Sequence, residues 1–345
     1  MRVALDATYS IGRHLSGVGV YSNELLQGLA RERPDLRFQF CYRPHRFFKS
    51  LGQHLPANAS RFLLHDRYRV PSRADLFHGL NQRLPDRHMR RRVVTFHDLF
   101  VFTHEFSTPG FRDRFQSISR SAAERADLII AVSQFTADQL TGILNVDPAR
   151  IRVVHHGVQP EYFATSPALP REKVVLHVGA IQSRKGIETL IAAFEALPSE
   201  WRLVLAGSLG FDADSIVQKI RGSRTAPRIL LTGYTSQVEL EKWYRKASIF
   251  AFPSRGEGFG IPVLEAMAAG VPVICSATSS LPEVAGNAAL LVPPDDTVAW
   301  REGLLSLAES FSLRNELVAK GTARVSGFTW QRAAQRTLDV YRELL

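Results

Sequence analysis

The chain has 345 residues, of which 45% are hydrophobic and 22% charged, and it carries a formal net charge of +10. This length predicts two domains, and the composition is that of a soluble globular protein. No apolar run approaches the roughly 18 residues of a membrane-spanning helix, the N-terminus lacks a secretory signal, and the two cysteines lie in apolar runs that do not predict a disulfide framework. We therefore expect a cytoplasmic protein.

The first half of the chain alternates short apolar strands with longer helical patterns. Strands are expected at residues 3–6, 38–42, 76–78, 93–97, 128–132 and 152–155, and helices at 21–31, 111–126 and 134–144. Such alternation predicts a doubly wound parallel sheet. Prolines at 160, 167 and 170 then break the pattern and indicate a linker, so the first domain is expected to span residues 1–165.

A second alternating series follows the linker and predicts a second Rossmann-like domain over residues 166–327. Its strands are expected at residues 174–179, 203–207, 229–231, 249–253, 273–276 and 289–292. Its helices are expected at 186–197, 213–221, 236–246, 262–269, 281–285 and 297–310. Two such α/β domains in tandem are expected to face each other across a ligand-binding cleft.

Two glutamates flank the start of a helix in the second domain. The strand at 249–253 leads into a glycine-rich loop, Pro262 suits the first position of the helix that follows, and Gly270 suits its end. Backbone N–H groups and the helix dipole at such a place form an anion site. Glu257 and Glu265 beside an anion site fit a ligand that also carries hydroxyls. A sugar nucleotide is such a ligand.

A basic pair stands near the end of the first strand of the second domain. Arg184 and Lys185 precede a helix, at the edge where parallel sheets present ligand-binding groups. A guanidinium and an ammonium there can neutralise a diphosphate. The alternative interpretation is a solvated basic turn.

Gly17 and Gly19 lie between the first strand and the first helix, where a phosphate-binding turn would stand. The third glycine of the dinucleotide fingerprint is absent and no acidic residue ends the strand at 38–42, so a nicotinamide enzyme is disfavoured. The two glycines still allow the backbone to approach a phosphate or sugar closely. A plain tight turn is the alternative.

His97 ends the strand at 93–97, again at the ligand-binding edge of its sheet. A histidine there can hydrogen-bond a sugar hydroxyl, and a structural hydrogen bond is the alternative. His155 and His156 lack converging third and fourth ligands, so we interpret them as structural and expect no metal site.

With these residues assembled, the chain resembles the retaining glycosyltransferases of family 4, which have the GT-B fold. The resemblance rests on two glutamates separated by seven residues, Glu257 and Glu265, and on the sequence that follows them to residue 274. Residues 279–293, 133–136 and 233–234 also resemble that family, and residues 328–345 resemble its C-terminal helix, which crosses back to the first domain.

The resemblance implies roles for individual residues. The catalytic residues that it implies are Glu257, His97, Lys185 and Arg184. The donor-binding residues that it implies are Gly17, Gly19, Arg184, Lys185, Tyr234, Phe259, Gly260, Ile261 and Glu265. In this assignment the two cations and the loop amides hold the diphosphate, Glu265 binds the ribose, Glu257 and His97 contact the hexose, and Tyr234 lies beside the base.

The function expected from the resemblance is retaining transfer of a hexose from a nucleotide diphosphate sugar to the hydroxyl of a glycan or lipid-linked glycan. No metal and no further cofactor are expected. GDP-mannose is favoured over UDP-linked sugars, because the residues around Gly17 and His97 look like those of bacterial mannosyltransferases of surface polysaccharide assembly. Two alternatives stay open: a sugar-nucleotide epimerase or phosphorylase on the same fold, and a non-catalytic binder of phosphorylated ligands.

The charge is unevenly distributed and bears on the partners. Residues 1–165 carry 23 Lys or Arg against 15 Asp or Glu, whereas residues 166–345 carry 20 against 18. Basic runs at 43–49 and 87–92 add to this excess. We expect a lipid-diphosphate-linked acceptor at an acidic membrane surface, and no nucleic acid. A basic surface that serves solubility alone is the alternative. The oligomeric state stays open.

Overall fold

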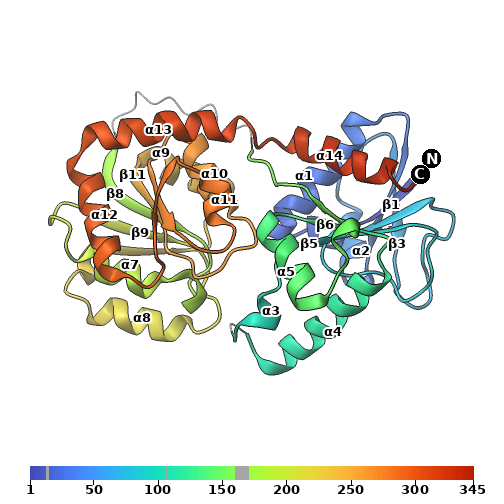
Figure 1. The fold of residues 1–345 in the computed structure, drawn as a ribbon, viewed down its shortest axis with the longest axis horizontal. Coiled ribbons are helices and arrows are strands. Elements are labelled where there is room, and N and C mark those ends of the chain that lie inside the picture. Colours follow the sequence, from blue (N-terminus) through green and yellow to red (C-terminus); the bar gives the residue numbers. More distant parts are fainter. Residues whose placement is uncertain (13–14, 106, 160–170) are drawn as a thin grey trace. The chain divides into compact units, whose positions relative to one another are not determined.

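The computed structural model describes residues 1–12, 15–105, 107–159 and 171–345. The chain divides into two compact units (Figure 1): unit 1 comprises Met1–Gly157 and Thr329–Leu345, and unit 2 comprises Val158–Phe328. Helices cover both faces of the sheet in each unit, as expected for a parallel sheet whose two faces must both be buried (Figure 1). Within the described residues no helix is long and apolar enough to cross a membrane.

Unit 1 is built on a seven-stranded parallel sheet. Across the sheet its strands are β3 (Ala59–Leu63), β2 (Arg37–Tyr42), β1 (Arg2–Asp6), β4 (Leu76–Gly79), β5 (Arg92–Phe96), β6 (Leu128–Ala131) and β7 (Ile151–Val153). In the register, Val3 of β1 lies between Phe38 of β2 and Leu76 of β4. The strand order therefore reverses at β1, and such a reversal creates a ligand crevice at the carboxyl ends of the strands.

The helices of unit 1 alternate with these strands. They are α1 (Gly17–Glu32), α2 (Pro44–Ser50), α3 (Phe100–Thr103), α4 (Pro109–Arg125), α5 (Gln134–Leu144) and α14 (Trp330–Arg342), with 3-10 turns η1 (Thr8–Ser10) and η2 (Pro148–Arg150). The C-terminal helix α14 packs against α1 (Figure 1). A Cβ atom on Gly28 of α1 would lie 3.1 Å from the Cβ of Ala334, so this glycine allows the two helices to approach closely.

Unit 2 is built on a six-stranded parallel sheet. Its strands, in order, are β10 (Ile229–Gly233), β9 (Arg202–Ala206), β8 (Glu172–Val178), β11 (Ala247–Phe252), β12 (Val273–Ser276) and β13 (Ala289–Val292). Its helices are α7 (Ile187–Phe194), α8 (Ala213–Gly222), α9 (Gln237–Lys246), α10 (Ile261–Ala268), α11 (Leu281–Ala285), α12 (Thr297–Glu309) and α13 (Phe311–Val325), with turns η3 (Ser183–Lys185) and η4 (Ala226–Arg228). Its core includes Leu203, Ile249 and Trp300, all fully buried. This packing fixes the strand ends that carry the candidate site.

The doubly wound parallel sheets expected from the sequence are present in both units. The edge strand β3 and the helices α2, α3 and α13 were not predicted. The expected domain boundary after residue 165 lies outside the described residues, and contacts group Val158 with unit 2 and Thr329–Leu345 with unit 1. The prediction for Pro262 was wrong by one position, because α10 begins at Ile261 with Gly260 in the left-handed region as its N-cap.

Candidate functional site

The candidate site of unit 2 lies at the carboxyl ends of two paired strands. β8 and β11 are neighbours in the parallel sheet, so the loops that follow them leave the sheet at the same edge. The loop after β8 carries Arg184 and Lys185 in the turn η3, and the loop after β11 carries Glu257. A Cβ atom on Gly186 would lie 2.0 Å from the carbonyl oxygen of Pro253, so a glycine is needed where the two loops meet.

The two loops join through a cluster of charges in which Lys185 and Glu257 are buried and Arg184 is partly buried. The Nζ atom of Lys185 lies 2.5 Å from Oε1 of Glu257, and a guanidinium nitrogen of Arg184 lies 3.4 Å from Oε2. Lys185 is 8% exposed and Glu257 9%. Nζ also lies 5.1 Å from the ring centroid of Phe252, which adds a cation–π contact. Arg184 further donates to the carbonyl of Gly256.

These contacts keep Glu257 ionised. Burial raises the pKa of the Glu257 carboxyl, but Lys185 and Arg184 lower it by more, so that it falls to about 2. An ionised carboxylate accepts hydrogen bonds and cannot donate a proton. Glu257 is therefore suited to binding hydroxyl groups and unsuited to acting as a general acid.

Glu265 has the opposite environment. It lies in α10, is 9% exposed, and has no ion pair within the described residues. Its Oε2 accepts a hydrogen bond from the hydroxyl of Tyr244 at 2.9 Å. Burial raises the pKa of Glu265 to about 7, although the Tyr244 hydrogen bond lowers it. Near neutral pH this carboxyl can gain or lose a proton.

Two serines that the sequence did not single out as site residues hold the glycine-rich loop. Ser279 Oγ accepts a hydrogen bond from the backbone N–H of Glu257 at 3.0 Å. Ser280 Oγ donates to the carbonyls of Glu257 and Phe259 at 2.8 and 2.9 Å. Both serines lie in the 279–293 segment that resembles the family, but only the fold brings that segment to the loop. They act by fixing the backbone around Glu257.

The other residues of unit 2 that were predicted to bind the donor differ in their exposure and in the element that carries them. The side chain of Phe259 is 4% exposed and packs against Phe328, with 6.0 Å between ring centroids, so only its backbone can serve a ligand. Gly260 and Ile261 lie at the start of α10, as the anion-site prediction requires. Tyr234 follows β10 and is 43% exposed.

In unit 1, His97 follows β5 and is 7% exposed. Its Nε2 lies 2.9 Å from the carbonyl oxygen of Leu80, which can only accept, so Nε2 carries the proton and Nδ1 presents a lone pair. Burial lowers the pKa of His97 to about 4, although the Leu80 hydrogen bond raises it. The ring of Tyr21 packs edge-on against it at 4.8 Å. A neutral imidazole held in this way suits hydrogen bonding to a hydroxyl.

The two predicted glycines of unit 1 belong to the first turn of α1, which begins four residues earlier than expected. Ser16 caps this turn by accepting a hydrogen bond from the N–H of Gly19. A Cβ atom on Gly19 would lie 3.0 Å from the carbonyl of Tyr9, whereas one on Gly17 would meet no heavy atom within 4 Å. Gly19 therefore has a packing role, and Gly17 is open for close approach.

The described residues contain no group of three or more His, Cys, Asp or Glu side chains that could hold a metal ion. His156 instead packs in an aromatic cluster, 4.8 Å from Tyr21 and 5.7 Å from Trp330 between ring centroids. This agrees with its interpretation as a structural residue.

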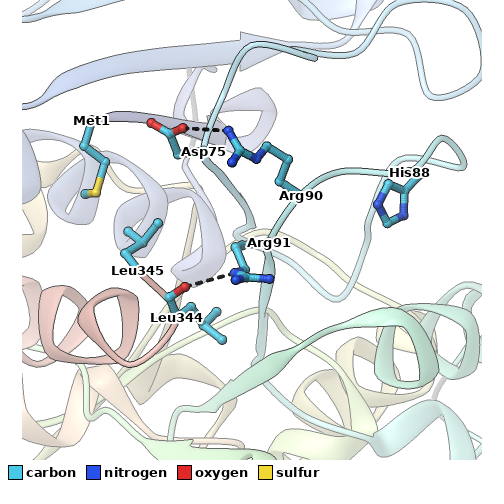
Figure 2. Close-up of a pocket in the computed structure, with 7 residues that line it drawn as sticks. All are labelled: Met1, Asp75, His88, Arg90, Arg91, Leu344 and Leu345. Carbon is cyan, nitrogen blue, oxygen red and sulfur yellow. Dashed lines mark hydrogen bonds and ion pairs between the residues drawn. The ribbon is translucent and has the colours of Figure 1, made fainter.

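Unit 1 contains a pocket of about 540 Å³ whose lining residues do not include His97 (Figure 2). It is lined by Met1, Asp75, His88, Arg90, Arg91, Leu344 and Leu345. Met1, Asp75 and Arg91 directly precede β1, β4 and β5, so the pocket lies at the amino ends of these strands, whereas His97 follows the carboxyl end of β5. Figure 2 shows Arg90 paired with Asp75 and Arg91 donating to the carbonyl of Leu344. Two arginines of the basic run at 87–92 thus make polar contacts within unit 1 itself.

Comparison with known proteins identifies the family. A model described as glycosyl transferases group 1 matches residues 158–324, and a model described as Glycosyltransferase Family 4 matches residues 15–162. The chain is 31% identical to the O-antigen chain mannosyltransferase B of Escherichia coli over 98% of this chain and 99% of that protein. The chain belongs to glycosyltransferase family 4. It is also 31% identical to a D-inositol 3-phosphate glycosyltransferase of Nocardioides sp. over 64% of this chain and 54% of that protein.

Solved structures agree on the fold of this glycosyltransferase. Sucrose-phosphate synthase from Thermosynechococcus elongatus superposes with a TM-score of 0.82 at 23% identity, covering 100% of this chain and 99% of that chain. Anabaena HepE in complex with UDP and glucose superposes with a TM-score of 0.75 at 18% identity, covering 99% of each chain. Because both identities are below 25%, these superpositions support the fold alone, which is the GT-B class expected from the sequence.

Proposed function

We propose that this glycosyltransferase moves a hexose, with retention at the anomeric carbon, from a nucleotide diphosphate sugar to a hydroxyl of a glycan or lipid-linked glycan. The proposal needs no metal and no further cofactor. One observation carries it: two cations and an ionised glutamate form a largely buried cluster at the carboxyl ends of β8 and β11. A nucleotide diphosphate sugar carries the matching groups, because its diphosphate is anionic and its sugars carry hydroxyls.

The charges of the site residues indicate which part of the donor each residue binds. Negative charge grows on the diphosphate as the glycosidic bond breaks, and Arg184 and Lys185 stabilise it together with backbone N–H groups at the start of α10. Glu257, held ionised by the same cations, accepts hydrogen bonds from hexose hydroxyls. The acceptor hydroxyl attacks from the side of the leaving group, and its proton passes to a phosphate oxygen. His97 binds a sugar hydroxyl through its Nδ1 lone pair.

Mannose from GDP-mannose is the donor we favour. The relative that matches almost the whole chain is named an O-antigen chain mannosyltransferase, and a second relative, 27% identical over 74% of this chain, is the serotype-specific mannosyltransferase WbdA of Escherichia coli. Their names also support a role in assembling a bacterial surface polysaccharide. The Anabaena HepE structures hold UDP and UDP-glucose, so UDP-sugars are the competing donors.

A thermal-shift panel of GDP- and UDP-linked sugars tests the donor, because a bound ligand raises the unfolding temperature according to its affinity. GDP-mannose is expected to give the largest shift, and a larger shift with a UDP-sugar would contradict that choice.

The anomeric proton of the product, followed by NMR in the presence of a chelator, tests the reaction. An inverted anomer, or loss of transfer on chelation, would contradict the proposed mechanism. Phosphate acting as the acceptor would point to a phosphorylase.

We further propose a cytoplasmic protein whose unit 1 contacts an acidic membrane surface, where a lipid-diphosphate-linked acceptor would lie. The short helix α2 supports this, because it exposes Phe48 by 75% and Lys49 beside it, and Leu51 directly after the helix is 58% exposed. An exposed aromatic ring flanked by a cation suits the headgroup region of a membrane. Sedimentation with vesicles containing 30% anionic lipid should retain the wild type and release a Phe48→Ala/Lys49→Ala variant. No retention of the wild type at low salt would overturn the membrane contact.

A further inference from the structure

The two glutamates of the site are held in different ways. Glu257 is fixed by two cations, whereas within the described residues Glu265 accepts one hydrogen bond, from the hydroxyl of Tyr244 to Oε2 at 2.9 Å. Glu265 is a buried carboxyl with no ion pair in the same part of the chain. A single neutral donor therefore orients this side chain and leaves Oε1 for a ligand.

Tyr244 is well placed to orient a carboxylate. It lies in α9, is fully buried, and its ring packs beside that of Phe250 with 5.8 Å between centroids. Its hydroxyl also lies 3.4 Å from the carbonyl oxygen of Pro262, in the first turn of the helix that carries Glu265. The phenol oxygen thus lies within hydrogen-bond distance of two acceptors of α10, and the shorter contact is the one to Glu265.

We propose that Tyr244 is a positioning residue, which holds Oε2 of Glu265 so that the carboxylate can accept hydrogen bonds from the two adjacent ribose hydroxyls of the donor. This inference rests on the proposed function, in which Glu265 binds the ribose. It adds a residue from α9, a helix that carries none of the predicted site residues. Tyr244 itself does not contact the ligand.

A hydroxyl that only stabilises the fold would affect all ligands alike, whereas a hydroxyl that orients Glu265 affects only ligands with ribose hydroxyls. The variant Tyr244→Phe keeps the buried ring and removes the donor. Calorimetry should compare GDP and UDP with their 2′,3′-dideoxy analogues on the wild type, Tyr244→Phe, Glu265→Gln and the double variant. Tyr341→Phe is the matched control, because it removes the buried hydroxyl that lies 2.6 Å from His78 in unit 1.

The proposal predicts that Tyr244→Phe weakens binding of the ribonucleotide by about tenfold, the size expected for a lost hydrogen bond to a charged group. It predicts unchanged binding of the dideoxy analogue, no further loss when Tyr244→Phe is added to Glu265→Gln, and unchanged affinities in Tyr341→Phe. Equal losses of affinity for the ribonucleotide and its dideoxy analogue, or additive losses in the double variant, would overturn the positioning role of Tyr244. Neither result would contradict the proposed function. A wild type that binds neither diphosphate would overturn the proposed function as well.

Discussion

Replacing Lys185 by methionine tests how much the ion pair between Lys185 and Glu257 stabilises the protein. Methionine keeps the length and apolar character of the side chain but removes the ammonium that lies 2.5 Å from Glu257. The carboxylate then stays buried with only Arg184, 3.4 Å away, to compensate its charge. We therefore expect Lys185→Met to destabilise the protein at neutral pH.

The magnitude follows from the pKa of Glu257. Lowering it from the ordinary 4.5 to about 2 corresponds to roughly 3 kcal/mol in favour of the ionised form. Breaking a buried ion pair by removing one partner costs about 3–5 kcal/mol in general. Because Arg184 remains, we expect Lys185→Met to lower the free energy of unfolding by about 3 kcal/mol at pH 7. Since a depressed carboxyl pKa stabilises the fold above the unfolded value, this difference should shrink as the pH falls from 4.5 toward 2.

Urea unfolding followed by tryptophan fluorescence measures this effect, because three of the four tryptophans lie in unit 2. Lys173→Met is the matched control: its ion pair with Glu200 is 2.9 Å long but about half exposed on both sides, and its loss should cost under about 1 kcal/mol. Lys185→Met/Glu257→Gln should recover part of the stability. A loss of stability in Lys185→Met no larger than in Lys173→Met, or one that does not depend on pH, would show that the ion pair of Lys185 with Glu257 does not stabilise the fold.

Two further predictions concern the ribose side and the loop junction. Burial raises the pKa of Glu265 to about 7, and an ionised carboxylate is the better acceptor for ribose hydroxyls, so nucleotide affinity should rise with pH up to about 7, by as much as tenfold per pH unit below it. Calorimetry from pH 5.5 to 8 checks this, and Glu265→Gln should give a flat profile; a wild type as flat as that variant would argue against the assignment. Gly186→Ala should lower the unfolding temperature strongly, because its Cβ would lie 2.0 Å from the Pro253 carbonyl at a φ of +63°, whereas Gly17→Ala, with no heavy atom within 4 Å, should leave it unchanged. Equal unfolding temperatures for the two alanine variants would contradict the packing described at the loop junction.

Most of both sheets could be predicted from the sequence, because buried parallel strands are short apolar runs. The strand β3 escaped prediction because its sequence, Ala-Ser-Arg-Phe-Leu, has only two large apolar residues, whereas the edge strand β10 of unit 2 begins with the apolar run Ile-Leu-Leu and was predicted. The first turn of α1 was interpreted as a phosphate-binding or tight turn because of Gly17 and Gly19. The Ser16 cap that starts the helix there becomes evident only from the backbone.

The residues of the candidate site were predicted one by one from the sequence. Only the fold shows which of them contact one another. Lys185 and Glu257 are 72 positions apart, and parallel-sheet logic could bring their loops to one edge but could not show that they form an ion pair. Tyr244 falls inside a predicted helix, where a tyrosine is typical of packing. Its partner Glu265 lies 21 positions away in another helix, and periodicity gives no sign of that hydrogen bond.

In the proposed function, Lys185 and Arg184 hold the diphosphate of the donor, and the glutamates bind its hydroxyls. This assignment is tested by the affinities of wild type and Lys185→Met for a nucleoside diphosphate and for the corresponding nucleoside. The variant is expected to lose at least about tenfold in affinity for the diphosphate, the effect of one charge-assisted contact, and nothing in affinity for the nucleoside. A folded Lys185→Met variant that binds the diphosphate as tightly as the wild type would contradict it.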